Sequence, residues 1–65
     1  IQMPDDLAAV LAETPSAQAM FDTLSAQNRY AVLLRVSTAR TAQTRRNRID
    51  RLVAMLARGE TPHPQ

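Results

Sequence analysis

Residues 41–59 read TAQTRRNRIDRLVAMLARG, and this stretch decides the fold class. Its apolar residues recur at the three- and four-residue spacing of one helix face, at Ile49, Leu52, Val53 and Leu56. Thr41 is a typical N-cap residue, and Gly59, the only glycine of the chain, stands at the usual C′ position. The pattern predicts a helix from Thr41 to about Arg58. Other helices must cover its apolar face, since no strand pattern is present.

Two shorter helices are expected at the start of the chain. Asp5 and Asp6 place negative charge where a helix dipole favours it, which predicts a first helix that ends near Glu13. Thr14 and Pro15 form a restart signal, with Thr14 as N-cap and Pro15 at the first helical position, where its missing N–H costs nothing. The apolar face of this second helix is predicted at Ala17, Met20, Phe21 and Leu24.

A third helix follows Ser25, which is its expected N-cap, and we predict it to be the most buried. Its main stripe is expected at Tyr30, Leu33, Leu34 and Ser37, with Val32 and Val36 on a second side. Because the connections are short, consecutive helices should be neighbours in space. We therefore predict an all-α fold, a compact array of four short helices. It forms a single domain over residues 1–65, with its core at about 4–59 and a disordered tail at 60–65.

The composition argues against several classes of function. The 65 residues include no cysteine, so no disulfide can form. The single histidine, His63, lies between two prolines, without the further ligands that a metal needs and out of reach of a serine nucleophile. We expect no catalytic residue, no metal site and no cofactor. The longest apolar stretches, 7–12 and 52–57, fall far short of the roughly 20 residues that span a bilayer, so no membrane span is expected.

Charge is distributed unevenly along the chain. Residues 1–28 contain four acidic residues and no arginine, a net charge of −4, whereas residues 29–65 contain eight arginines and two acidic residues, a net charge of +6. There is no lysine. Either the acidic half packs on the basic half or the basic half meets an anion from outside, such as an unknown protein, another anionic partner or a neighbouring domain of the same chain.

Five arginines lie in the twelve residues from Arg40 to Arg51. At about 100° per residue, Arg48, Arg51 and Arg58 share a side of the last helix that should face solvent. Arg46 precedes Asp50 by four residues, which predicts a weak surface pair. The expected binding face therefore consists of Arg40, Arg46, Arg48 and Arg51.

Arg45 is expected to differ from these arginines, because it precedes Ile49 by four residues and falls within the apolar stripe. A covered guanidinium needs a carboxylate or several carbonyls around it. We predict an internal salt bridge, with Asp22 as the first candidate partner. The alternative is an external anion, such as a phosphate or a carboxylate of a partner.

Nucleic-acid binding is the alternative to a protein-interaction role. A basic stripe on a helix is typical of nucleic-acid-binding proteins. However, the single tyrosine and the single phenylalanine both occupy core-stripe positions, so no platform for base stacking is expected. The residues Ala39-Arg40-Thr41 are also weak evidence for the turn of a helix-turn-helix motif. A non-catalytic interaction module is therefore the preferred prediction.

One further pattern runs along the chain, through Met3-Pro4-Asp5-Asp6-Leu7, Leu11, Ala17 to Phe21, Leu24-Ser25, Ala39-Arg40, Thr44-Arg45, Arg48-Ile49, Leu56 and Gly59. In these residues the chain resembles the YdeI/OmpD-associated (OmdA) bacteriocin-protection family, over about residues 3–59. The family signature Ala-Lys-x-x-Glu-Thr-Arg-x-x-Arg-Ile corresponds to Ala39 to Ile49, with Arg40 in place of Lys and Gln43 in place of Glu. Within the pattern, Thr44, Arg45, Ile49 and Gly59 are expected to be structural.

The resemblance implies a small helical domain of bacterial proteins linked to resistance against bacteriocins and cationic peptides. Such a domain frequently follows a small β-rich domain, so we expect the chain to be the C-terminal part of a longer protein. The compartment stays open. The absence of an export signal favours the cytoplasm, whereas the association of the family with an outer-membrane porin would imply the periplasm.

Overall fold

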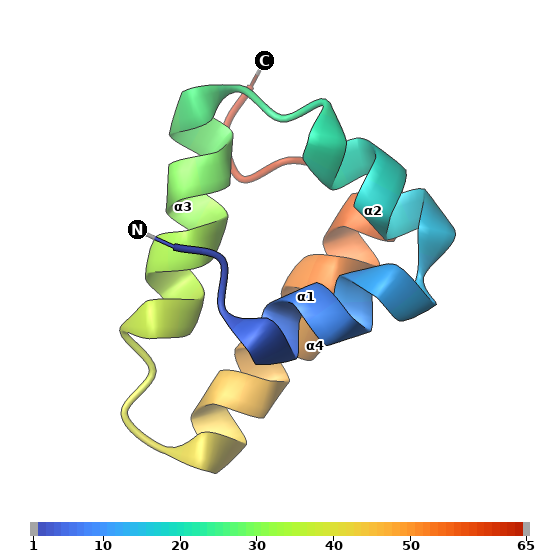
Figure 1. Cartoon of the computed structure of the whole chain (residues 1–65). Helices are drawn as coiled ribbons and strands as arrows, with labels where there is room; N and C mark the ends of the chain where they lie inside the picture. Colours follow the sequence, from blue (N-terminus) through green and yellow to red (C-terminus); the bar gives the residue numbers. More distant parts are fainter. Residues whose placement is uncertain (1, 65) are drawn as a thin grey trace.

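The computed structural model describes residues 2–64 and contains four helices in this part of the chain. They are α1 (Asp5–Glu13), α2 (Pro15–Asp22), α3 (Ala26–Ser37) and α4 (Ala42–Ala57), and no strand occurs among the described residues (Figure 1). The predicted all-α array of four helices is confirmed. None of the described helices combines the length and the apolar character that a membrane crossing requires.

The helix ends follow local signals in the sequence. The Ser25 hydroxyl accepts a hydrogen bond from the Asn28 N–H at 3.2 Å, and the Thr41 hydroxyl accepts one from the Thr44 N–H at 3.1 Å. Gly59 follows the last turn of α4 with φ = 79°, a value that glycine adopts at little cost. Thr14 does precede α2, but its hydroxyl donates to the Val10 carbonyl at 3.2 Å and makes no cap. The expected side-chain cap at Thr14 is therefore wrong.

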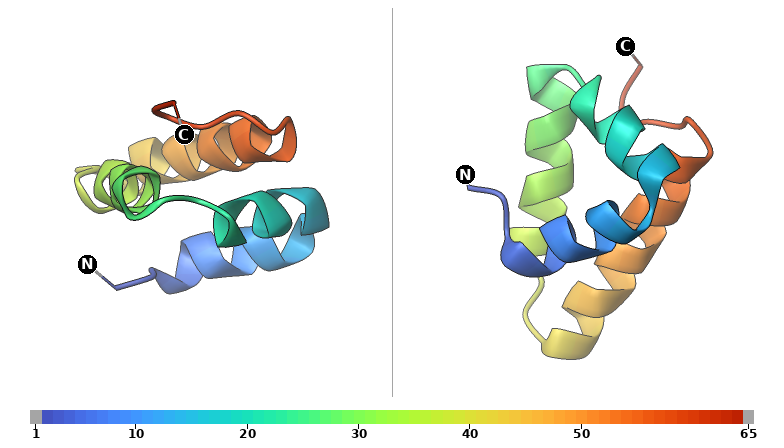
Figure 2. Two further views of the ribbon diagram at one scale, coloured as in Figure 1. Left: turned by 90° about the horizontal axis from the view of Figure 1, so that it is seen from above. Right: turned by 45° about the vertical axis from the view of Figure 1, so that its right-hand side comes forward.

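Helix α4 is the centre of the packing. It contacts each of the other three helices, most extensively α2. In Figure 1, α1 and α2 cross in front of α4, whereas α3 stands beside them and diverges from α4 above the connection at residues 38–41. Seen from above, α1 and α4 lie on opposite sides of the molecule (Figure 2). The core consists of Leu7, Leu11, Ala17, Phe21, Leu24, Val32, Leu33, Val36, Ile49, Leu52, Val53 and Leu56.

Helix α3 presents a different face to the core from the predicted one. Tyr30 and Leu34 are 53% and 39% exposed, so the expected stripe is wrong at these positions, whereas Leu33 is buried as predicted. The buried residues are Asn28, Val32, Leu33 and Val36. The stripe through Val32 and Val36 begins at Asn28, a polar residue that is fully buried and hydrogen-bonded. Sequence periodicity undervalued this side because its first position is an amide.

The tail after Gly59 returns from the end of α4 towards the start of α3 (Figures 1 and 2). The Asn28 amide donates to the His63 carbonyl at 3.0 Å, and the His63 N–H donates to the Asn28 amide oxygen at 2.8 Å. Thr61 and Pro62 are half-buried. Residues 61–63 therefore lie against the helices, because a buried amide pairs with this backbone. Residue 65 lies outside the described part of the chain.

Candidate functional site

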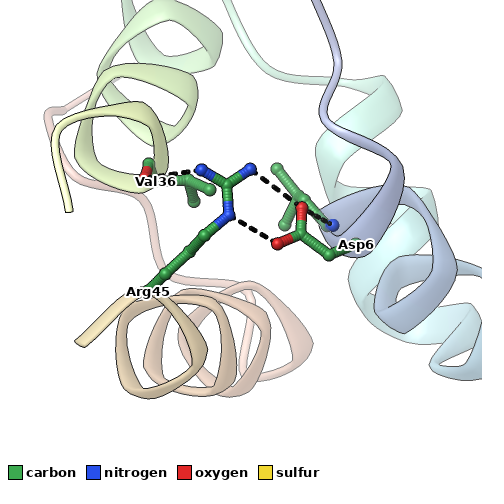
Figure 3. A network of polar contacts seen from close by, with 4 residues as sticks. Asp6, Val36 and Arg45 are labelled. Carbon is green, nitrogen blue, oxygen red and sulfur yellow. Dashed lines mark hydrogen bonds and ion pairs between the residues drawn. The ribbon is translucent and has the colours of Figure 1, made fainter. Parts of the chain in front are cut away.

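Arg45, near the start of α4, reaches between α1 and α3 (Figure 3). Its Nε lies 2.5 Å from Oδ2 of Asp6, its Nη2 donates to Oδ1 of Asp6 at 3.0 Å, and its Nη1 donates to the Val36 carbonyl at 3.4 Å. The predicted internal salt bridge is confirmed, but its partner is Asp6 and not Asp22. Asp22 instead accepts a hydrogen bond from the Gln18 amide at 3.0 Å, on the exposed side of α2.

This ion pair changes the protonation equilibria of both groups. The Arg45 guanidinium holds the pKa of the Asp6 carboxyl below its ordinary value, chiefly through the side-chain hydrogen bonds. Desolvation opposes this change, and the hydrogen bond from the Leu7 N–H adds to it. In return, Asp6 raises the pKa of Arg45. Through these hydrogen bonds Arg45 ties the start of α4 to both α1 and α3.

Arg48, one turn further along α4, is half-buried instead of facing solvent as predicted. Its Nη1 donates to the Arg35 carbonyl at 2.9 Å and to the Thr38 hydroxyl at 3.2 Å. The last carbonyls of a helix have no partner within the helix and favour positive charge. The expectation was wrong because it treated α4 as an isolated helix, whereas the last turn of α3 lies within reach of this side.

A groove lies between α3 and α4, with a volume of about 380 Å³. Its lining includes three arginines and one apolar residue, Arg35, Arg48, Arg51 and Leu52. Arg35 and Arg51 are exposed and make no ion pair with any of residues 2–64. Sequence reasoning missed Arg35 as a site residue. Arg35 lies beside the stripe of Val32 and Val36, so it could have been predicted as a site residue if this stripe had been taken as the buried face of α3.

The structure separates the four arginines predicted to form one binding face. Arg48 and Arg51 line the groove, whereas Arg40 and Arg46 do not. Arg40 is exposed in the connection between α3 and α4. Arg46 is exposed, and its Nε lies 3.3 Å from the Asp50 carboxylate, so the predicted surface pair is confirmed.

The four expected structural residues lie at helix ends or in the core. The Thr44 N–H donates a hydrogen bond to the Thr41 hydroxyl. The Thr44 hydroxyl in turn accepts a hydrogen bond from the Thr41 hydroxyl at 2.9 Å. Ile49 is 1% exposed in the core, and Gly59 ends α4. Together with Arg45, these residues fix where α4 begins, how it packs and where it ends.

The negative charges of the described chain lie away from the groove. Helix α3 contains no acidic residue, and the single acidic residue of α4 is Asp50, which pairs with Arg46. Glu60 pairs with Arg58 at 3.2 Å. No carboxylate lines the groove among the described residues, so its positive charge is not compensated locally.

A family model described as "Bacteriocin-protection, YdeI or OmpD-Associated" matches residues 1–59, which include all four helices. The comparisons with curated proteins and with solved structures gave no match. Among the described residues, no group of three histidine, cysteine, aspartate or glutamate side chains is placed to hold a metal ion.

Proposed function

Because the chain belongs to the family of YdeI- or OmpD-associated bacteriocin-protection proteins, we propose that it is a non-catalytic interaction module that supports this protection by binding an anionic partner. Family membership carries the link to bacteriocin protection. The observation that carries the mode of action is the set of arginines between α3 and α4 that no carboxylate neutralises within residues 2–64.

Charge complementarity indicates the sign of the partner. Like charges placed close together repel, and the repulsion is relieved when an anion binds. Three arginines elsewhere already have carboxylate partners, namely Arg45, Arg46 and Arg58. Arg35, Arg48 and Arg51 have none among the described residues, so their charge is available to a binding partner.

The same charge argues against direct capture of a cationic peptide. A cationic peptide would be repelled from the groove, so protection through this face requires a component of the cell that carries negative charge. The module would then act on a target or a transporter of the toxic peptide and not on the peptide itself.

Nucleic acid is the second candidate partner, and one observation favours it. Tyr30 is exposed, which corrects the expectation that both aromatic residues lie in the core. A single exposed ring on α3 offers one stacking surface, but Tyr30 does not line the arginine groove. We therefore retain the anionic protein as the preferred partner.

A survival assay tests the proposed function. Bacteria that express the chain and bacteria that lack it are exposed to a dilution series of a bacteriocin, and the expected result is higher survival of the expressing cells. Equal survival at every dose would contradict the protective role. In parallel, fluorescence anisotropy with duplex and single-stranded oligonucleotides is measured across salt concentrations. Tight binding whose affinity falls steeply with salt would replace the protein partner by nucleic acid.

A further inference from the structure

The groove between α3 and α4 has arginines on both walls. Arg35 comes from α3, whereas Arg48 and Arg51 come from α4, one turn apart on the side that faces α3. The two helices diverge from the connection at residues 38–41 in Figure 1 and in the right-hand view of Figure 2. A ligand in the groove would therefore meet positive charge from two helices at once.

Arg48 is held in place, whereas Arg35 and Arg51 are not. The Nη1 atom of Arg48 is engaged with the Arg35 carbonyl and the Thr38 hydroxyl, which orients its guanidinium. A planar guanidinium can still pair with a carboxylate through its remaining N–H groups. The exposed Arg35 and Arg51 side chains are free to turn towards a ligand. The groove thus combines one fixed donor group with two adaptable ones.

The size and the lining of the groove limit the ligand. A volume of about 380 Å³ lies at the lower end of the range for sites that hold small organic ligands or a few side chains. Leu52, which is 5% exposed, is the one apolar residue among the described residues that line the groove, and none of these residues is aromatic. Base stacking is therefore absent from the groove, and a lone inorganic anion would leave most of the volume empty.

We propose that the α3–α4 groove binds a short acidic segment of a partner protein, with Arg35 and Arg51 pairing with its carboxylates across Arg48. This inference rests on the proposed function and names the chemistry of the anionic partner. Arginine is suited to the role because its planar fork binds carboxylates with two parallel hydrogen bonds.

Fluorescence anisotropy with labelled peptides tests the proposal. The first probe is a peptide of sequence GSDELDESG, and the comparison peptide is GSNQLNQSG, which has the same length but lacks the carboxylates. The chain should bind the first peptide and should not bind the second measurably. Affinity should fall as NaCl is raised, because salt screens exposed charges.

Two double variants with the same change in net charge locate the binding site. R35Q/R51Q removes charges from the groove, whereas R40Q/R46Q removes charges that do not line it. The groove variant should lose about tenfold or more in peptide affinity, and the control variant should lose about threefold or less. Circular dichroism confirms that both variants remain helical, as expected for exposed side chains.

Nuclear magnetic resonance gives a second readout that needs no variant. Titration of GSDELDESG into the ¹⁵N-labelled chain should shift the amide signals of Arg35, Arg48, Arg51 and Leu52 most strongly. The largest shifts on α1 or α2 would overturn the proposal, as would equal loss of affinity in both double variants. A duplex oligonucleotide that competes with the peptide and binds more tightly would also overturn it in favour of phosphate groups.

The outcomes separate this inference from the proposed function. Higher survival without peptide binding in the groove would overturn the groove assignment and leave the protective role in place. Peptide binding in the groove without any effect on survival would contradict the protective role and support the groove.

Discussion

Arg45 and Arg48 lie three residues apart on α4, yet their guanidinium groups contact different kinds of acceptor. Arg45 pairs with the Asp6 carboxylate of α1 and contacts the Val36 carbonyl. Within residues 2–64, Arg48 donates to two neutral acceptors at the end of α3, the Arg35 carbonyl and the Thr38 hydroxyl. The positive charge of Arg45 is therefore neutralised by the Asp6 carboxylate, whereas no described carboxylate neutralises the charge of Arg48.

The packing follows the same division. Between α1, α2 and α4 the contacts are mainly apolar, through residues such as Leu11 and Leu56. Between α3 and α4 the helices diverge, the groove opens, and the tail is joined to α3 by the Asn28 amide. The two sides of α4 therefore differ: one is buried against α1 and α2, whereas the other lies at a groove with arginines that no described carboxylate neutralises.

The largest loss of stability is expected from a change in the apolar contacts between α1, α2 and α4. Leu11 is fully buried, and its replacement by alanine should cost about 2 to 5 kcal/mol through lost burial and the remaining cavity. A single core of this size supplies only about 3 to 5 kcal/mol. Leu11→Ala should therefore lose cooperative thermal unfolding by circular dichroism. Leu34→Ala, at an exposed position of α3, is the control and should unfold almost as the wild type does. Similar curves for the two variants would contradict this picture of the core.

The second-largest effect on stability is expected where the tail meets α3. Asn28→Ala removes both hydrogen bonds to the His63 backbone and should cost about 1 to 3 kcal/mol, because two hydrogen bonds of a fully buried amide are lost. Hydrogen exchange should become faster at the His63 amide while the α1 and α2 amides remain protected. His63→Ala keeps the backbone groups and should be close to neutral. Faster exchange throughout the chain would show that the tail is not a separate unit.

The smallest effect is expected at the ion pair, and it should depend on pH. The pKa of Asp6 is lowered in the folded state, so the pair contributes stability above the pKa that Asp6 has in the unfolded chain. That contribution is lost as pH falls through the lowered pKa of the folded state. Arg45→Met should lower the melting temperature by a few degrees at neutral pH, and its difference from the wild type should shrink in acid.

A matched control for the pH prediction is the exposed pair of Arg46 and Asp50. Asp50→Asn should change the melting temperature less than Arg45→Met does at neutral pH, because exposed pairs four residues apart on a helix contribute only about 0.3 to 0.5 kcal/mol. A difference between Arg45→Met and the wild type that stays constant from neutral to acid pH would contradict a role through the Asp6 carboxylate.

Local signals predicted the helices well, because caps and periodicity act over a few residues. Ser25, Thr41 and Gly59 marked helix ends through contacts with their own neighbourhood. The choice of face on α3 failed because the Tyr30 and Val32 stripes are similarly apolar in sequence. The buried stripe begins at Asn28, whose amide is paired with the tail 35 residues away.

The site was predicted only in part, for the same reason. The position of Arg45 within the apolar stripe indicated that it needs a partner, but the choice of Asp6 over Asp22 depends on how α1 packs against α4. The sequence could not show that Arg35 lines the same groove as Arg48 and Arg51, because this depends on the angle between α3 and α4 and no local pattern specifies that angle.

The pairing of Asn28 with His63 also has a consequence for the order of folding. Its two partners are separated by most of α3 and all of α4, so closing this loop has an entropic cost that docking of the two helices must first offset. The contact should therefore form after the helices have assembled and open before they separate. A transition-state analysis of Asn28→Ala should accordingly find faster unfolding with little change in the folding rate.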